Sequence, residues 1–382
     1  MPVGRKRSEE EAPTPGFTRR VQRTGASSLS VTLPKSWTDS MNLKIGTVLR
    51  FRDLGEGRLE ISPAEVDTPS QRHQKLLKID ATEAPPNLLA RLLIGGYITG
   101  QDQIVVSSRT GLSTEQLHEI RRTASHVIGM SIVDEDPERV EVQNFVDPGR
   151  FQLHRLLNQL VRMLRAELQA CQSALADGDP APLAPLGPLE DEIDRFYLLM
   201  VRQLLLSSDD FQVARDIGVE SHHYQIGYRL VAKVLEVTGD LVSAVVRELV
   251  TSLASIRRLP PTALADLTAL LSHLDEFLGR TMEAFTQLSV VDSNGVLNEL
   301  HAALERGSEL EESIVHKAAN RPTAIAAQRI VSNLLMATEM LVIINEVTIN
   351  RSVEPETVAR TDRSVSMESR TGGDDEAPPR RA

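Results

Sequence analysis

The sequence predicts a multidomain protein that combines a small all-β domain, a small α+β module and an all-α region of two three-helix bundles. Three observations predict this order. Short runs with period-two alternation follow Arg19, strand and helix patterns alternate over residues 75–146, and apolar residues at three- and four-residue spacing fill the chain from Arg150. A chain of 382 residues is also too long for one ordinary core.

The composition is that of a folded soluble protein, with 41% hydrophobic and 25% charged residues. Cys171 is the sole cysteine, which excludes an internal disulfide framework and fits a reducing compartment. The first residues lack the apolar core of a signal peptide, and no window of about 18 residues is uniformly apolar, as a membrane span requires. We therefore expect a cytoplasmic protein with no membrane insertion.

Charge is unevenly distributed along the chain. The net charge is −11, yet residues 1–63 hold 11 Lys and Arg against 7 Asp and Glu, which is +4 and leaves −15 for the remainder. A basic front on an acidic body indicates an anionic partner for that front. A solvated surface with uneven charge would give the same totals.

The front of the chain has three parts. Residues 1–18 mix charge and proline and predict a disordered arm. Residues 19–65 predict short strands in the runs "SLSVTL", "TVLRFRD" and "GRLEIS", with glycines at the turns. This segment is too small and polar to bury a good core alone, so we expect it to form a homodimer.

The basic segment "RRVQRTGASSLSVTLPKSWTDSMNLKIGTVLRF" resembles the SpoVT/AbrB swapped-hairpin DNA-binding domain. The shared pattern is a basic strand, a Gly/Ser turn, a strand ending in Leu33-Pro34-Lys35, a one-turn helix, then Leu43 and Gly46. Thr47 stands where the family usually has an acid. The resemblance covers about 45 residues.

The resemblance implies that two chains interlock their hairpins into one dimeric barrel with a basic surface for DNA. The candidate DNA-binding residues are Arg19, Arg20, Gln22, Arg23 and Lys35. Lys and Arg contacts to phosphates would supply the salt-dependent affinity, while an Arg or Gln22 could read base edges. Alternatively, the arginines solvate a barrel rim whose role is dimerisation alone.

Residues 75–146 predict a compact α+β module of about 70 residues. "KLLKID" and "QIVVSS" are strands, each followed by a helix, "NLLARLLIGGYI" and "STEQLHEIRRTASHVI". A Ser/Thr cap with Glu115 behind it opens the second helix. "SIVDED" and "RVEVQNF" predict a closing hairpin.

From Arg150 the spacing predicts six long helices, joined by short breakers such as "SSDD" and "RLPP". Their expected ranges are 150–177, 187–207, 221–253, 261–289, 294–318 and 322–351. They predict two antiparallel three-helix bundles, over residues 150–253 and 261–351. Residues 354–382 predict a disordered tail.

The third helix contains Leu235-Glu236-Val237-Thr238-Gly239-Asp240, which resembles the signature helix of PhoU phosphate-uptake regulators. Val237 replaces the family's arginine. The preceding helix has Glu190 and Asp194 at the places of the partner motif. The resemblance covers roughly residues 150–350, and the whole order resembles archaeal members that join an AbrB-like front to a PhoU-like back.

Acids four apart share one helix face, so two adjacent helices could aim Glu190, Asp194, Glu236 and Asp240 at one patch. Such oxygen ligands suit hard ions such as Mg²⁺, Mn²⁺ or iron, and zinc is a further candidate. The resemblance to PhoU implies metal binding there. A solvated acidic helix face is the alternative, because acid pairs at this spacing are common by chance in a chain with 53 acids.

The second bundle has fewer candidate metal-binding acids than the first. Glu305 and Glu309 lie where the fifth helix should supply its pair, and Glu339 where the sixth should supply an Asp. Leu335 stands at the place of the other acid and cannot bind a metal, so we expect this second site to be weak or lost.

Together these features predict a non-enzymatic DNA-binding regulator of phosphate uptake, whose helical bundles sense a metal, a phosphate ABC transporter or a signalling protein. The alternative is an adaptor whose front domain only dimerises and which contacts the transporter or its sensor kinase directly. No GxxxxGK[ST], HExxH or GxSxG motif supports an NTPase, zincin or hydrolase. An enzyme acting at the acidic patch is a third class.

Overall fold

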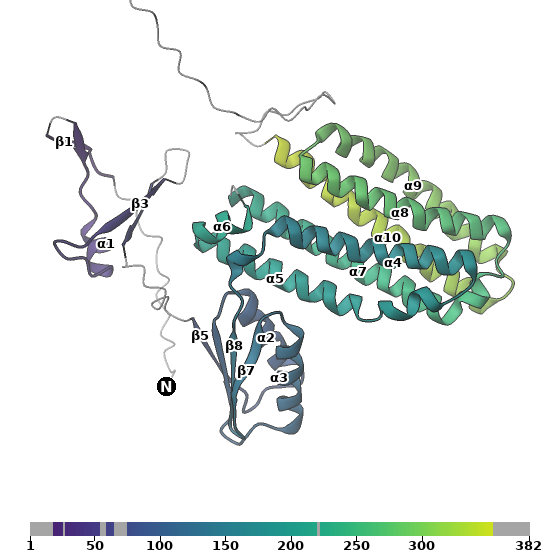
Figure 1. Cartoon of the computed structure of the whole chain (residues 1–382), viewed down its shortest axis with the longest axis horizontal. Helices are drawn as coiled ribbons and strands as arrows, with labels where there is room; N and C mark the ends of the chain where they lie inside the picture. The colour runs from purple at the N-terminus through teal and green to yellow at the C-terminus, as the bar shows by residue number, and fades with distance from the viewer. Residues whose placement is uncertain (1–17, 26, 54–58, 65–74, 220–221, 354–382) are drawn as a thin grey trace, which may run out of the picture. The chain divides into compact units, whose positions relative to one another are not determined.

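The computed structural model describes residues 18–25, 27–53, 59–64, 75–219 and 222–353. The predicted disordered arm, apart from its last residue, and the predicted tail lie outside these residues. The chain divides into two compact units, Met1–His73 and Gln74–Ala382. A small β-rich region thus precedes a mostly helical one, which confirms the coarse order of the prediction (Figure 1).

The N-terminal unit consists of two small antiparallel sheets and one short helix. β1 (Gln22–Thr24) pairs with β2 (Ser28–Ser30), and β3 (Leu49–Asp53) pairs with β4 (Leu59–Pro63). Helix α1 (Lys35–Ser40) begins directly after Pro34, whose carbonyl accepts a 3.0 Å hydrogen bond from the Thr38 amide. None of the side chains that the structure describes in this unit is buried, so these residues form no core in a single chain.

The α+β module begins the second unit. Its elements are β5 (Leu76–Asp80), α2 (Leu88–Ile98), β6 (Gln103–Ser107), α3 (Thr114–His126), β7 (Met130–Glu135) and β8 (Arg139–Asn144). The sheet order is β5-β6-β8-β7, with β5 and β6 parallel and the other neighbours antiparallel. Apolar residues of the strands and of both helices form one core, including Leu93, Val106, Ile120 and Val142.

Local sequence explains the start of α3. The Ser113 hydroxyl accepts a hydrogen bond from the Gln116 amide, and the Gln116 side chain accepts one from the Ser113 amide. This reciprocal pair satisfies two amides that the first turn leaves without helical partners. The partner of the predicted cap is therefore Gln116, one residue beyond Glu115.

The rest of the unit is helical. Its long helices are α4 (Leu153–Asp177), α5 (Leu189–Asp209), α7 (His222–Ile256), α8 (Pro261–Gln287), α9 (Val290–Lys317) and α10 (Arg321–Ser352). A short helix α6 (Phe211–Ile217) follows the predicted break at Asp210, whose side chain accepts a hydrogen bond from the Gln212 amide. The 3-10 segments η1 (Pro148–Arg150) and η2 (Ala181–Leu186) lie before and after α4.

The six long helices share a single hydrophobic core rather than two separate ones. α7 and α10 run side by side: a Cβ at Gly227 would lie 3.1 Å from the Val347 side chain, and Arg329 pairs with Glu248 at 3.4 Å. α4 also meets α8, where Arg165 Nε donates to Asp275 at 2.6 Å. The two sets of three helices are therefore fused along these contacts (Figure 1).

α10 is the one helix of the described residues that is long and apolar enough to cross a membrane by length and composition. Of its apolar stretch, 56% is buried inside the protein. This burial is what the central helix of a helical core requires.

The α+β module is fixed to the helical bundle through α5. The Arg202 side chain is 2% exposed; its guanidinium donates to the carbonyls of Tyr97 and, at 3.1 Å, of Gln101, and lies 5.0 Å from the Tyr97 ring centroid. The Gln203 amide donates to the carbonyls of Pro148 and Phe151, each at 2.7 Å. These buried contacts hold the end of α2 and the segment after β8 against α5.

Candidate functional site

The β1–β2 ribbon is the core of the predicted DNA-binding segment. Arg23 stands opposite Leu29, Gln22 opposite Ser30, and a hydroxyl–hydroxyl bond of 2.7 Å joins Thr24 to Ser30. Gly25 makes the turn with φ of +86°, a conformation that L side chains rarely adopt. Because side chains alternate along a strand, Arg23 and Leu29 share one face and Gln22 lies on the other.

The structure places all five predicted DNA-binding residues at the surface. Arg19, Arg20, Gln22 and Arg23 lie in or just before β1, and Lys35 is the first residue of α1. Arg19 donates a 3.0 Å hydrogen bond to the neighbouring Thr18 carbonyl. Within one chain, however, Gln22 and Arg23 point to opposite faces of the ribbon. A single ribbon therefore cannot place both side chains in one DNA groove.

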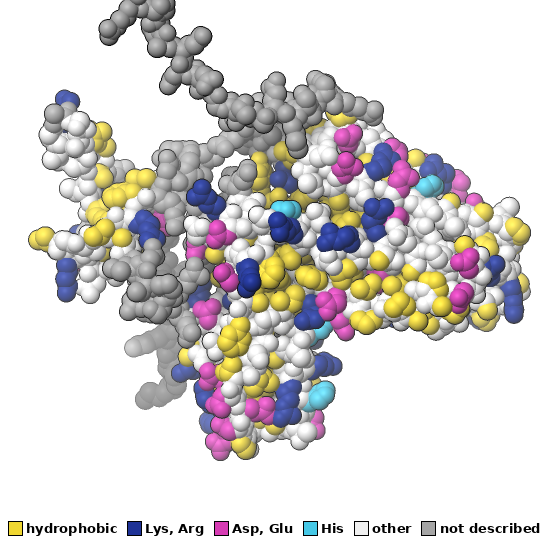
Figure 2. Space-filling view, in the orientation of Figure 1, with side chains coloured by type: hydrophobic (Ala, Val, Ile, Leu, Met, Phe, Trp, Pro, Cys, Tyr) yellow, Lys and Arg dark blue, Asp and Glu magenta, His cyan; other side chains and the backbone are white. Residues whose placement is uncertain are grey.

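The N-terminal unit exposes large apolar side chains. Leu29 is 74% exposed and Phe51 59% exposed. Val21, Val31, Met41, Ile45, Val48 and Leu59 are exposed as well. Figure 2 shows hydrophobic side chains, in yellow, on the surface of this unit. An apolar surface of this kind, on a unit whose described residues bury no side chain, needs a covering partner.

The four acids of the first predicted metal site come together on α5 and α7. Gly239 allows the two helices to approach closely, since a Cβ there would lie 3.1 Å from the Ile193 side chain. Burial, then the charges of Asp240 and Glu236 and, more weakly, of Glu190, raise the pKa of Asp194 to about 6. Burial and the charges of Glu236 and Glu190 raise the pKa of Asp240 as well.

Two cations on α7 already compensate part of this acidic charge. Lys233 forms an ion pair with Glu236, and Arg247 forms one with Glu190. No group of three or more His, Cys, Asp or Glu side chains among the residues that the structure describes is arranged to hold a metal ion as it stands. The all-oxygen donors suit a hard cation in their chemistry, but their present arrangement serves internal ion pairs.

Glu167 on α4 is a functional candidate that the sequence analysis missed. The residue is 1% exposed, and its Oε1 accepts a 2.9 Å hydrogen bond from the Ser243 hydroxyl. Its Oε2 has no hydrogen-bond partner among the residues that the structure describes. Burial raises the pKa of Glu167 to about 7, and the Glu190 charge adds to the effect. Its signal in the sequence was an acid within the apolar stripe of its helix, between Leu164 and Cys171.

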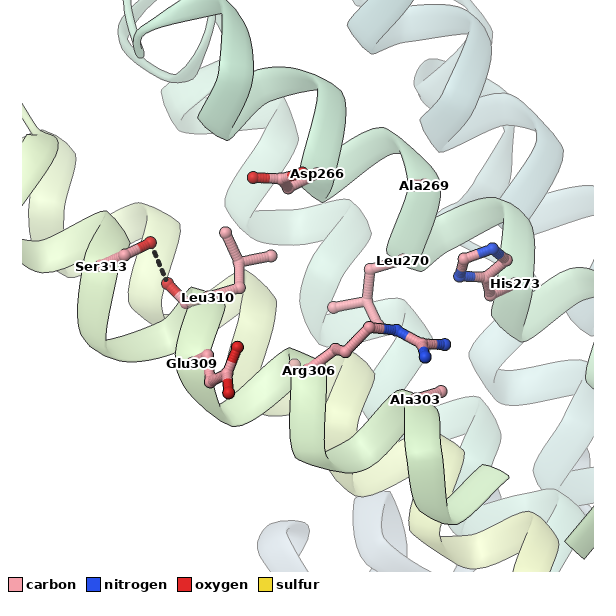
Figure 3. A pocket seen from close by; sticks show the side chains of 10 residues that line it. Asp266, Ala269, Leu270, His273, Ala303, Arg306, Glu309, Leu310 and Ser313 are labelled. Carbon is pink, nitrogen blue, oxygen red and sulfur yellow. Dashed lines mark hydrogen bonds between the residues drawn. The ribbon is translucent and has the colours of Figure 1, made fainter. Parts of the chain in front are cut away.

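The second predicted set does not gather in the same way. Glu305 and Glu309 are exposed on α9, and Glu339 is exposed on α10. Figure 3 shows Glu309 beside a hollow of about 440 Å³ between α8 and α9, with Asp266 on α8. Leu335 is buried, and a Cβ at Gly307 would lie 2.1 Å from its side chain, so the place expected for an acid is filled by helix packing.

Comparison with known proteins supports the N-terminal assignment. Residues 22–68 match the family model described as "Antidote-toxin recognition MazE, bacterial antitoxin". This match supports an N-terminal DNA-binding domain of the SpoVT/AbrB type and is consistent with a DNA-binding regulator. No curated protein and no solved structure matches the chain.

Proposed function

We propose that the protein is a DNA-binding transcriptional regulator that acts as a homodimer through its N-terminal unit. One observation carries this proposal: the described residues of that unit bury no side chain, yet the unit matches a DNA-binding domain family and exposes apolar residues such as Leu29 and Phe51. A second copy covering these residues would supply the core that one copy lacks. Pairing would also double the basic charge available to DNA.

We propose that the helical body binds a regulatory partner and that this binding changes the DNA affinity of the N-terminal unit. The resemblance of its third long helix to the PhoU signature supports phosphate uptake as the controlled process. A transporter component or signalling protein is the proposed partner. Such a partner changes DNA affinity to the extent that it binds one state of the protein better than the other, and DNA changes partner affinity by the same factor.

Metal binding at the acidic patch of α5 and α7 is proposed as the second means of sensing. Asp194 and Asp240 would be the first ligands, because neither forms an ion pair within the described part of the chain. Glu190 and Glu236 would join after leaving Arg247 and Lys233. A divalent cation would relieve the carboxylate repulsion. Calorimetric titration of the full chain with Mn²⁺ tests this, with Asp240→Asn expected to weaken binding and Glu339→Gln to leave it unchanged.

The dimer is tested by matched charge insertions on β2. Leu29→Asp places a carboxylate on the ribbon face that carries Leu29 and Arg23, whereas Ser28→Asp places the same charge on the opposite face. In sedimentation equilibrium of the full chain, we expect the first variant to become monomeric and the second to remain a dimer. Two variants with the same oligomeric state as the unmodified protein would refute the covering role of that face.

DNA binding is tested by its salt dependence. Each phosphate contact contributes about 0.9 to the slope of log K against log salt, so Arg20→Gln should lower that slope by about 2 in a dimer. Footprinting with fragments of the source genome should enrich sites upstream of phosphate-transport genes. Enrichment elsewhere would leave the DNA-binding role standing and remove the phosphate role.

An adaptor that dimerises without contacting DNA is the second candidate. It is favoured by the opposite orientation of Gln22 and Arg23 on the ribbon and by the net charge of −11. Titration of duplex DNA at two salt concentrations discriminates the two functions. Weak binding without steep salt dependence would favour the adaptor.

A further inference from the structure

The α+β module carries an open hollow of about 780 Å³ where the chain leaves β5 and β6. Its walls are the loop from β5 to α2, the loop from β6 to α3, and one face of α3. Loops at the ends of a rigid sheet are frequent positions for ligand-binding residues. Neither the regulator nor the adaptor described above uses this hollow.

The two acids that line the hollow are held by backbone amides at helix starts. Glu119 accepts hydrogen bonds from the amides of Ala90, at 2.7 Å, and Asn87, at 3.3 Å, at the beginning of α2. Glu115 lies in the first turn of α3, where bonds to its own amide and to the Ser113 side chain lower its pKa. Both negative charges are therefore offset locally by hydrogen-bond donors.

The basic side chains that line the hollow are placed differently. His118 and Arg122 stand one turn apart on α3 and are exposed. Within the described residues, neither side chain forms an ion pair or a hydrogen bond. The neighbouring Arg121 instead pairs with Glu135, and Arg109 lies 3.5 Å from Asp80. The Arg122 guanidinium is thus a forked hydrogen-bond donor at the hollow, and no acid of the described residues pairs with it.

The rest of the lining suits the body of a small molecule. Ala84, Pro85 and Pro86 give an apolar wall on the loop before α2, and Thr114 adds a hydroxyl at the start of α3. A pocket with an apolar wall and a few polar groups is the usual form of a small-molecule site.

We propose that this hollow binds a small organic anion, a phosphate ester or a carboxylate, as a regulatory ligand. The Arg122 guanidinium holds the anionic group in a two-bond fork, His118 supplies a second donor, and the apolar wall contacts the remainder of the molecule. The inference does not depend on DNA binding or on the helical body.

The test is calorimetric titration of the full chain, at fixed ionic strength, with inorganic phosphate, adenosine 5′-monophosphate and succinate. We expect at least one probe to bind with a Kd of about 1 mM or tighter. Binding of the nucleotide assigns a phosphate ester, and binding of succinate assigns a carboxylate. Arg122→Gln should weaken that binding about tenfold or more, the loss expected for a charge-assisted contact.

Arg91→Gln is the matched control, because it removes the same charge from an exposed position on α2 that does not line the hollow. It should change the Kd less than about twofold. His118→Asn should weaken binding by a smaller factor than Arg122→Gln. The proposal is overturned if no probe binds at about 10 mM, or if Arg91→Gln weakens binding as much as Arg122→Gln.

Discussion

Glu167→Gln gives the sharpest test of the electrostatics inside the helical body. The carboxyl is almost fully buried and has a pKa of about 7 against an ordinary value of 4.5, with burial as the main cause. This difference corresponds to about 3 kcal/mol between the charged and neutral forms. Glutamine keeps the shape and an acceptor for the Ser243 hydroxyl but cannot ionise.

The raised pKa sets how the unfolding free energy changes with pH. The folded protein holds a proton on Glu167 that the unfolded chain releases, so the stability from this group is full below pH 4.5 and is lost as the pH rises through about 7. Relative to the unmodified protein, Glu167→Gln should therefore gain about 2.5 kcal/mol between about pH 5 and about pH 8, because the unfolded carboxyl is already largely ionised at pH 5. The glutamine atom that replaces Oε2 will also lack a partner there, which lowers the unfolding free energy of the variant by the same amount at both pH values.

The assay is urea unfolding of both proteins, monitored by helical circular dichroism, at the two pH values. Glu305→Gln is the control, because this residue is exposed on α9. It should leave the pH dependence of the unfolding free energy unchanged. If Glu167→Gln shows the same pH dependence as the unmodified protein, the buried acid is not protonated in the folded state and the reasoning is wrong.

Three further outcomes are expected. Arg202→Met should lower the unfolding free energy by about 2 kcal/mol, because it removes charged hydrogen bonds to two carbonyls. Hydrogen exchange should also rise at the end of α2. An unchanged unfolding free energy would contradict the role of Arg202 in holding α2 against α5. Gly307→Ala should destabilise by about 1–3 kcal/mol in urea unfolding, because its methyl group overlaps the Leu335 side chain. Gly295→Ala, on the same helix with open space around it, should stabilise by about 0.5–1 kcal/mol, and equal effects at both glycines would refute the packing argument. Burial raises the pKa of Cys171 to about 12, so iodoacetamide should modify it only after unfolding, and rapid labelling of the folded protein would show that the core opens.

Local sequence was enough to place most elements of the second unit. Period-two runs located β5, β6 and β8 to within a residue or two, and breakers such as Pro260 located the helix ends. Helix α6 was missed, because seven residues are too few for a periodic signal. The partner of the Ser113 cap was also misplaced by one residue, since Glu115 and Gln116 are both suitable side chains.

Contacts between helices could not be predicted. Periodicity showed that α7 and α10 are apolar on one face, but not that they pack against each other as well as within their own sets. The spacing of the acids predicted that those of α5 and α7 share a patch. The ion pair from Arg247 to Glu190 could not be predicted, because it depends on how the two helices pack. Lys233, three residues before Glu236, was visible in the sequence as a partner and was overlooked.

The fused helical core has a consequence for the preparation of fragments. α7 is covered by α10, and α4 by α8, so a truncation after Leu259 would strip apolar faces from α4 and α7 at once. A recombinant piece that ends there would offer these surfaces to other molecules and aggregate. Any dissection of this protein should therefore keep α4 to α10 intact and place its cut between His73 and Lys75, at the boundary of the two units.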